Sequence, residues 1–317
     1  MNIKLKKISI VAACYNEENN LQELYDRLIK IFKQLPQYDY EIIVADNYST
    51  DGSRAILRRI ATHDKKFKVI LNSRNFGHVR SPYNALIQGH GDAVIPMCSD
   101  LQDPPELIVD FIREWENGAN VVCAVKQQNN ESLVMSVVRR FYYWLLVKFS
   151  ENAQIRNFTG FGLYDRKFME ALKQFHDPYP YFRGIVSEIG LKRVEIPFIK
   201  SKRKHGRTKN NFFTLYDLAM TGFVNHTKLP LRLAALCGFC LAVLSLLIAL
   251  AYFIYKLLFW ETFNLGLAPL IIGLFFFSAV QLIFIGIIGE YIGAIYTHVK
   301  NKPLVIEEEK LNFDDQP

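Results

Sequence analysis

The stretch Glu41-Ile-Ile-Val-Ala45, followed at once by Asp46-Asn-Tyr-Ser-Thr-Asp51-Gly52, carries the pattern that decides the fold. A short apolar run rich in β-branched residues predicts a buried strand, and the polar run after it predicts a loop at the carboxyl end of that strand. Similar strands are predicted at 8–13, 68–71 and 92–97, with helices between them at 21–32, 53–60 and 81–88. Because strands alternate with helices, the sequence predicts an α/β domain whose largely parallel sheet is covered on both faces.

Polar clusters follow three of these strands. They lie at 16–18, 46–51 and 100–103. Each cluster alone has an ordinary alternative as a turn or a helix cap, a role that suits Asp51 and Ser53. Together they predict a ligand site, because ligands of such sheets bind beyond the carboxyl ends of the strands. The absence of Gly-x-Gly-x-x-Gly and of Gly-Lys-Ser/Thr argues against a dinucleotide fold and a P-loop.

The net charge of the 317 residues is +7, which fits partners that are nucleic acids, anionic lipids or phosphorylated substrates. The apolar segments of the C-terminal third favour the last two, so we expect no nucleic-acid partner. The five cysteines show no metal-site spacing with histidines nearby. They are interpreted as reduced thiols, which fits a cytosolic catalytic domain.

Two nearly uninterrupted apolar segments, at about 233–256 and 267–289, are each long enough to cross a bilayer as a helix. The alternative is a buried hairpin of a soluble protein, but such helices rarely lack a polar face. Basic residues flank the pair on its outer sides and are absent from the loop between the segments; they are Lys228, Arg232, Lys300 and Lys302. The positive-inside rule therefore predicts a multi-pass protein of the plasma (inner) membrane with its catalytic domain and both termini in the cytoplasm.

These features divide the chain into a catalytic domain at 1–210, a juxtamembrane amphipathic segment at 211–230, a membrane hairpin at 231–296 and a cytoplasmic tail at 297–317. Gly289 and Gly293 form a small-xxx-small pattern suited to close helix packing. The pattern would join either the two spans or two protomers, so a homo-oligomer is one of two open interpretations.

Four motifs follow the predicted strands in order: Cys14-Tyr-Asn-Glu-Glu-x-Asn20, Ala45-Asp-x-x-Ser-Thr-Asp-Gly52, Ser73-Arg-Asn-Phe-Gly-His78 and Ser99-Asp-Leu-Gln-Asp-Pro-Pro-Glu106. In this order they resemble the family 2 polyprenyl-phosphate and dolichyl-phosphate glycosyltransferases. Gly289-Glu-Tyr-Ile-Gly293 and Val299-Lys-x-x-Pro303 resemble the end of the bacterial members with two spans, such as the bactoprenol glucosyltransferases. The resemblance covers nearly the whole chain.

The resemblance implies a GT-A fold and an inverting sugar transfer. Tyr15, Glu17 and Asp46 would bind the nucleoside, since carboxylates accept hydrogen bonds from ribose hydroxyls and base N–H groups. Asp100 and Gln102 would hold Mg²⁺ or Mn²⁺ against the diphosphate of the donor. The resemblance and the local acidity also make Asp100 and Asp103 the catalytic candidates.

Basic residues would bind the phosphates of the substrates. Arg203 and Lys209 fall on the basic positions of the family's Arg-x-x-Gly-x-Ser-Lys loop, with a solvated or lipid-facing basic run as the alternative. Arg139 and Arg140 lie in the apolar, aromatic segment 133–149. We expect this segment to be an interfacial helix that brings a lipid phosphate to the sugar, with a buried helix as the alternative.

The chain departs from the family pattern at several positions. Asn47 and Tyr48 replace the second and third residues of Asp-Asp-Gly-Ser, and Cys98 replaces the first carboxylate of Asp-x-Asp. Gly160 stands where many members have the Asp proposed as the base, so Asp103 and Asp165 are the remaining carboxylates to test for a role near the acceptor. A phosphate monoester is an anionic nucleophile at neutral pH and needs positioning more than deprotonation.

The implied function is transfer of a sugar from a nucleotide-sugar to a polyprenyl (undecaprenyl) phosphate, which makes a lipid-linked sugar donor for glycan decoration. A processive polysaccharide synthase is disfavoured, because no tryptophan follows an arginine in a Gln-x-x-Arg-Trp motif. The alternative from another class is a catalytically degenerate membrane adaptor that binds lipid phosphate or a partner enzyme.

Overall fold

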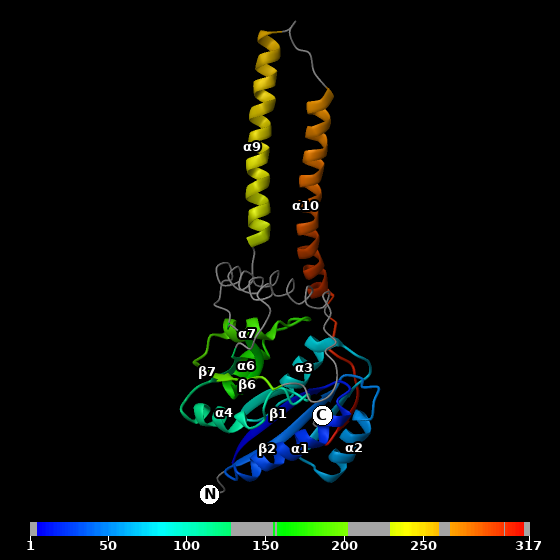
Figure 1. Ribbon diagram of the computed structural model, residues 1–317, viewed down its shortest axis with the longest axis vertical. Coiled ribbons are helices and arrows are strands. Elements are labelled where there is room, and N and C mark those ends of the chain that lie inside the picture. Colours follow the sequence, from blue (N-terminus) through cyan, green and yellow to red (C-terminus); the bar gives the residue numbers. More distant parts are fainter. Residues whose placement is uncertain are drawn as a thin grey trace. The chain divides into compact units, whose positions relative to one another are not determined.

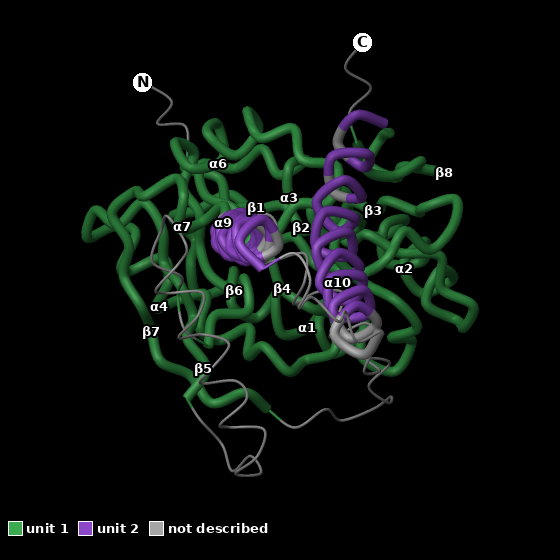
Figure 2. The backbone as a smooth tube through the Cα atoms, turned by 90° about the horizontal axis from the view of Figure 1, so that it is seen from above, with its two compact units in different colours: residues 1–148, 152–215, 301–317 green, residues 149–151, 216–300 purple. Residues whose placement is uncertain are grey.

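The computed structural model describes residues 5–127, 155, 157–201, 229–259, 267–300 and 302–313. The chain forms two compact units (Figure 2). Unit 1 comprises Met1–Lys148, Asn152–Leu215 and Asn301–Pro317, and unit 2 comprises Phe149–Glu151 and Tyr216–Lys300. The C-terminal residues therefore belong to the same unit as the N-terminal ones.

The described part of unit 1 alternates strands and helices (Figure 1). Its first half runs β1 (Lys6–Cys14), α1 (Glu18–Lys33), β2 (Tyr38–Asp46), α2 (Ser53–His63), β3 (Phe67–Asn72), α3 (Gly77–Ile87) and β4 (Ala93–Cys98). Its second half runs α4 (Leu107–Glu116), β5 (Val121–Lys126), β6 (Phe158–Asp165), α6 (Arg166–Leu172), α7 (Phe182–Ile189), β7 (Arg193–Phe198) and β8 (Glu307–Leu311). The elements predicted from the sequence correspond to β1 to β4 and α1 to α3.

The eight strands form one sheet in the order β7-β5-β6-β4-β1-β2-β3-β8. The four central neighbours β4, β1, β2 and β3 are parallel, and β5 pairs in parallel with β7. β6 and β8 are antiparallel to their neighbours. The predicted α/β fold with a mostly parallel sheet is therefore confirmed, with two antiparallel strands that the sequence pattern did not indicate.

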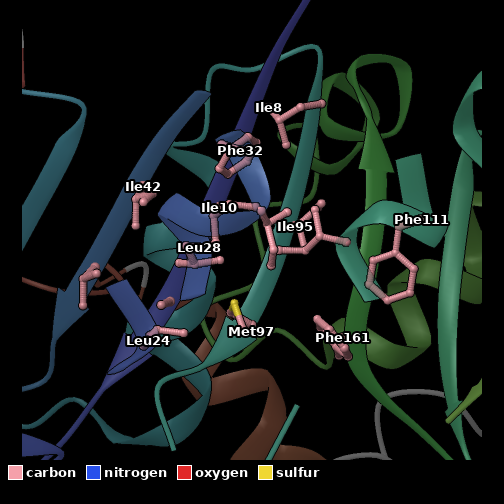
Figure 3. Packing of buried hydrophobic residues seen from close by; sticks show 14 of the residues in the cluster. Ile8, Ile10, Leu24, Leu28, Phe32, Ile42, Ile95, Met97, Phe111 and Phe161 are labelled. Atoms are coloured by element: carbon pink, nitrogen blue, oxygen red, sulfur yellow. The ribbon is translucent and has the colours of Figure 1, made fainter. Parts of the chain in front are cut away.

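Alternate residues of the central strands enter opposite layers, as the period of a strand requires. Ile8 and Ile10 of β1 pack with α1, α2 and α4, whereas Val11 packs with α3, α6 and α7 on the other face. Figure 3 shows the first of these layers, in which Leu24 and Leu28 of α1 lie among the strand side chains. Strands buried on both faces explain why the runs are continuously apolar.

Helix α1 follows from the spacing of its apolar residues. Leu21, Leu24 and Leu28 fall on one face and are buried. Glu18 in the first turn and Lys33 in the last complement the helix dipole. Because each buried leucine contributes about 1.5–3 kcal/mol relative to exposure, this face fixes the helix on the sheet.

Strand β8 lies within the segment 297–317, for which the sequence predicted only a tail. It pairs antiparallel with β3, from Val69 opposite Leu311 to Asn72 opposite Glu307, and Figure 2 shows it beside β3. Asn312 follows at φ 60° and donates to the carbonyl of Phe67 at 2.8 Å. The chain therefore returns to the catalytic domain after its apolar helices.

Unit 2 contains α9 (Leu229–Leu258) and α10 (Leu267–Val299). Both are long and apolar enough to cross a membrane, over Leu233–Tyr255 and Gly273–Thr297. The first span agrees with the prediction of about 233–256. The second helix begins at 267 as expected, but its apolar window ends later than the predicted 289.

Among the described residues, the glycines near the end of α10 lie away from α9. A Cβ built at Gly238 of α9 would lie 3.8 Å from Phe284 of α10, so the helices approach one another there. A Cβ at Gly289 or Gly293 would meet nothing within 4 Å among the described residues. The described residues thus show no packing of this glycine pattern against α9.

Candidate active site

The loops that follow β1, β2, β3 and β4 meet at one edge of the sheet, because these strands are parallel neighbours. The register places Cys14 beside Asp46, and Ala13 beside Cys98. Asp46 in turn lies beside Leu71 of β3. The polar clusters at 16–18, 46–51 and 100–103 are thus brought together at the carboxyl edge, where ligands of such sheets bind.

Asn16 ties the loop after β1 to the loop after β2. Its backbone is left-handed at φ 57°, which asparagine tolerates better than most residues. The Asn16 N–H donates to Ser49 Oγ at 2.8 Å, and Asn16 Oδ1 accepts from the Thr50 N–H at 2.8 Å. The Glu17 N–H donates to Ser53 Oγ at 3.0 Å. The two loops therefore form one hydrogen-bonded body.

The three residues predicted to bind the nucleoside differ in exposure. Tyr15 and Glu17 are half-buried in the loop after β1. Asp46 is fully buried, where its carboxylate accepts the Ser49 N–H at 3.0 Å and Arg54 Nε at 2.8 Å. Sequence reasoning missed Arg54. Its signal was a basic residue in the first turn of a helix, where the dipole disfavours positive charge unless a carboxylate is near.

Asn47 and Tyr48, the two departures in the second motif, have separate structural reasons. Asn47 is buried, and its Nδ2 donates to Asn75 Oδ1 at 2.9 Å and to the Gly77 carbonyl at 3.1 Å. Its Oδ1 accepts the Phe76 N–H at 2.9 Å. An amide satisfies both kinds of bond, whereas the carboxylate usual in the family has no N–H to donate. Asn47 therefore joins the loops after β2 and β3.

Tyr48 adopts φ 68°, the left-handed region that glycine normally occupies in this motif. An aromatic residue there is a backbone outlier. Tyr48 is 44% exposed, and its ring lies under the guanidinium of Arg54, with 5.0 Å between the Arg54 Cζ and the ring centroid. The strained residue thus stands at the site edge of the sheet.

The loop after β4 carries the acidic residues. Asp100 Oδ1 accepts the Gln102 N–H at 3.1 Å, and Leu101 between them has φ 57°. The Ser201 N–H donates to the Gln102 carbonyl at 3.1 Å. This bond brings the segment after β7, with Lys200, beside the acidic loop.

Asp103 is the most perturbed carboxyl group of the site. It is 4% exposed, and its Oδ1 accepts no hydrogen bond within the described residues. Burial raises the pKa of Asp103 to about 6; Lys200 opposes this shift and Asp100 adds to it. Such a shift in a polar edge is typical of a functional site.

The loop meets part of the chemistry of a hard divalent cation. Asp100, Gln102 and Asp103 offer oxygen atoms, and the unsatisfied Oδ1 of Asp103 would gain from a cation. Cys98 is exposed and offers a thiol, a poor ligand for such an ion. Across the described ranges, no three His, Cys, Asp or Glu side chains are grouped to hold a metal alone. The residues fit an ion that takes most of its ligands from phosphate and water.

Several predicted site residues and segments lie outside the described residues. They are Arg203, Lys209, Arg139 and Arg140, and the segments 133–149 and 211–228.

The expectation for Asp165 was wrong. Asp165 pairs with Ala93 at the start of β4, the edge opposite the site. Its carboxylate accepts the Phe168 N–H at 2.8 Å and Asn120 Nδ2 at 2.7 Å, so it caps α6.

Gly160, which stands at the family's Asp position, has φ 100°. A Cβ there would lie 3.3 Å from the ring of Phe182. An Asp would therefore be strained in this backbone, which gives a structural reason for its absence.

The sheet, its two helical layers and the acidic loops at its carboxyl edge define a GT-A-type domain. Residues 9–173 match the glycosyl transferase family 2, and the chain belongs to this family. It is a glycosyltransferase.

Relatives match along nearly the whole chain. The uncharacterized glycosyltransferase YkcC of Bacillus subtilis (strain 168) is 33% identical over 310 residues, which cover 97% of this chain and 95% of the relative. The SfII prophage-derived bactoprenol glucosyl transferase of Shigella flexneri is 32% identical over 301 residues, which cover 95% of this chain and 97% of the relative. The glucosyl-3-phosphoglycerate synthase of Mycobacterium tuberculosis shares the fold, with a TM-score of 0.50, 18% identity and coverage of 69% of this chain and 78% of that one.

Proposed function

We propose that the protein transfers a sugar, with inversion, from a nucleotide-sugar to a polyprenyl (undecaprenyl) phosphate at the cytoplasmic face of the membrane. One observation carries the proposal: the acidic carboxyl edge belongs to a unit whose chain leaves into two apolar helices and returns to the same sheet as β8. The near full-length similarity to a bactoprenol glucosyl transferase supports the acceptor. The lipid-linked product would then serve as a donor for glycan decoration.

In the proposed complex, Tyr15, Glu17 and Asp46 contact the nucleoside of the donor. The joined loops after β1 and β2 support this assignment, because they hold the three residues at one end of the sheet. Asp46 is already bonded to Arg54 and Ser49, so it contributes with a fixed carboxylate. A carboxylate that is already held in place loses little conformational entropy when it binds a ligand.

Asp100 and Gln102 would hold Mg²⁺ or Mn²⁺, with Asp103 beside them. When bound, the ion neutralises charge on the departing nucleoside diphosphate. The unsatisfied oxygen of Asp103 and the raised pKa of its carboxyl support a cation at this loop. The exposed thiol of Cys98 in place of a carboxylate predicts weak binding of the ion.

The acceptor phosphate supplies its own nucleophile. One of its oxygens attacks the anomeric carbon, and the bond from that carbon to the diphosphate breaks with its electron pair on the leaving group. No proton has to be removed from a dianionic phosphate, which is consistent with glycine at position 160. Arg203, Lys209, Arg139 and Arg140 are proposed phosphate contacts on sequence grounds alone.

The membrane arrangement is also a proposal. Two crossings return a chain to the side from which it started, and β8 completes the sheet of the domain that precedes α9. Large side chains such as Phe275 and Leu246 are exposed on the helices, as lipid contact requires. The basic residues that flank the two helices support a cytoplasmic catalytic domain. The open glycine face of α10 supports a homo-oligomer.

The test is sugar transfer by the full-length protein in detergent with undecaprenyl phosphate. Radiolabelled UDP-, GDP- and dTDP-sugars are supplied with Mn²⁺, Mg²⁺ or a chelator. We expect one donor to label the lipid, and Asp100→Ala to reduce labelling about 100-fold or more. Asp26→Ala, an exposed carboxylate of α1, is the control and should retain activity. If no donor labels the lipid, or Asp100→Ala labels it fully, the adaptor hypothesis replaces this one.

A further inference from the structure

Arg54 joins four separate parts of the catalytic domain. From the first turn of α2, its Nε donates to Asp46 Oδ2 at 2.8 Å and its Nη2 donates to the Asn72 carbonyl at 2.5 Å. Its Nη1 donates to Glu308 Oε2 at 3.0 Å, and its guanidinium lies over the ring of Tyr48. One side chain thus links the ends of β2 and β3 to β8.

These bonds use the planar geometry of arginine. The three nitrogen atoms of the guanidinium each have a different partner, so its plane is fixed. Asp46 is fully buried, and the Arg54 side chain is 18% exposed. The ion pair is therefore shielded from water, and Arg54, together with the Ser49 N–H, sets where the Asp46 carboxylate points.

Glu308 comes from the strand that follows the second apolar helix. β8 is the edge strand next to β3, so the Glu308 side chain reaches Arg54 across the end of the sheet. Through Arg54, the strand that follows α10 is therefore connected to the carboxyl end of β2, where Asp46 lies. Neither the family motifs nor the strand-end clusters include Arg54 or Glu308.

We propose that Arg54 is a positioning residue for the nucleotide-sugar donor, which orients Asp46 and is itself oriented by Glu308 of β8. The inference rests on the proposed donor role of Asp46. It makes donor affinity depend on the strand that returns from the membrane helices.

The chain offers a matched control one turn further along α2. Arg58 Nη2 donates to Glu309 Oε2 at 2.6 Å, so it joins the same helix to the same strand. Among the described residues the side chain of Arg58 bonds only Glu309, and Asp46 is not among its partners. If the arginines act only by docking β8, both Arg54→Ala and Arg58→Ala should raise KM. If Arg54 positions Asp46, only Arg54→Ala should do so.

The experiment measures binding and kinetics of the full-length protein in detergent. Isothermal titration with UDP, GDP and dTDP first identifies the nucleoside diphosphate that the parent binds. The Kd for that nucleotide, the KM and kcat for its sugar donor and the Tm are then measured for four variants. They are Arg54→Ala, Arg54→Lys, Glu308→Gln and Arg58→Ala.

We expect Arg54→Ala to raise Kd and KM about tenfold or more, with a smaller change in kcat, because a charge-assisted bond to Asp46 is lost. Arg54→Lys should restore part of the affinity, since lysine keeps the charge without the three-way geometry. Glu308→Gln should raise KM about two- to threefold, as its side chain is half exposed. Arg58→Ala should leave KM unchanged.

Equal KM values for Arg54→Ala, Glu308→Gln and Arg58→Ala would overturn the inference. If Arg54→Ala does not fold, Arg54→Lys and Glu308→Gln against Arg58→Ala decide the question by the same criterion. The variant Asp46→Asn distinguishes a failure of the inference from a failure of the proposed function. If Asp46→Asn binds the donor as the parent does, both the donor role of Asp46 and the inference are wrong. If Asp46→Asn binds the donor more weakly but the Arg54 and Glu308 variants keep the KM of the parent, the inference alone is wrong. A parent that binds none of the nucleotides overturns both.

Discussion

Glu41 of β2 and Asp103 of the loop after β4 are both buried carboxylates, yet their surroundings shift their pKa values in opposite directions. Glu41 is 1% exposed, and burial alone would raise its pKa. The Ser9 hydroxyl donates to it at 2.5 Å, and Lys68 and Lys7 lie at 2.9 and 3.0 Å. These bonds lower the pKa of Glu41 to about 2.

Asp103 at the carboxyl edge has an unsatisfied oxygen and Asp100 for a neighbour, and burial raises its pKa to about 6. Glu41 lies toward the other end of the strands, where Lys7 and Lys68 both form ion pairs with its carboxylate. The site edge leaves negative charge for a ligand to compensate. This contrast is typical of a sheet with one end stabilised by paired charges and the other end suited to binding a ligand.

Neutralising Glu41 should give the largest loss of stability. Its folded pKa lies below the ordinary value of 4.5, so its contribution is present above that value and is lost as the pH falls toward 2. We expect Glu41→Gln to lower the free energy of unfolding by about 3 kcal/mol at neutral pH. Denaturant unfolding followed by circular dichroism between pH 7 and 3 measures this, with the deficit shrinking as the pH falls.

Asp39→Asn is the matched control for Glu41→Gln. Asp39 lies on β2, as Glu41 does, and forms an exposed ion pair with Lys66. Its loss should be below about 1 kcal/mol. A deficit for Glu41→Gln no larger than that of the control would break the comparison.

Neutralising Asp103 should raise the free energy of unfolding, whereas neutralising Glu41 lowers it. Its folded pKa lies above the ordinary value of 3.8, so the folded state binds more protons and loses stability as the pH rises through about 6. We expect Asp103→Asn to be more stable than the parent by about 2 kcal/mol at neutral pH, with no difference below pH 4. The same pH series checks this, and sugar transfer by the variant should fall. A variant that is less stable at pH 7 would remove the contrast with Glu41.

Asn47→Asp would add a further carboxylate to the carboxyl edge of the sheet, next to Asp46. Its oxygens would face Asn75 Oδ1 and the Gly77 carbonyl, and two donated hydrogen bonds would be lost. We expect a loss of about 2 kcal/mol in the free energy of unfolding, although the change restores the family motif. Equal stability of parent and variant in denaturant would show that the amide is not needed there.

Tyr48→Gly tests strain at the same edge with the smallest effect. Glycine adopts φ 68° without cost, so we expect about 1 kcal/mol of added stability. If the exposed ring contacts the donor, KM rises while stability increases, which thermal unfolding and steady-state kinetics together detect. Lower stability would mean that the contact with Arg54 outweighs the strain.

Local patterns of residues were enough to predict β1 to β4 and α1 to α3. Continuous apolar runs such as Ile42–Ala45, and helical spacing such as that of Leu21, Leu24 and Leu28, are properties of neighbouring residues. The α/β class, the two apolar helices and the grouping of polar clusters follow from the same periodicities. Family membership also follows from the order of the motifs.

Contacts between distant residues decided the rest. β8 is a short acidic segment with no apolar pattern, and it becomes a strand only because β3 offers an open edge. Arg54 meets Glu308 across 254 positions of sequence, so no local pattern pairs them. Asp165 looked like a site residue until the antiparallel pairing of β6 placed it at the opposite edge. The amino-acid sequence therefore determined the helices and strands and the residue types at the strand ends. The pairing of strands decided which of these side chains lie together. Pairing brings together residues that are far apart in the sequence by closing long loops, and local patterns of neighbouring residues do not specify such contacts.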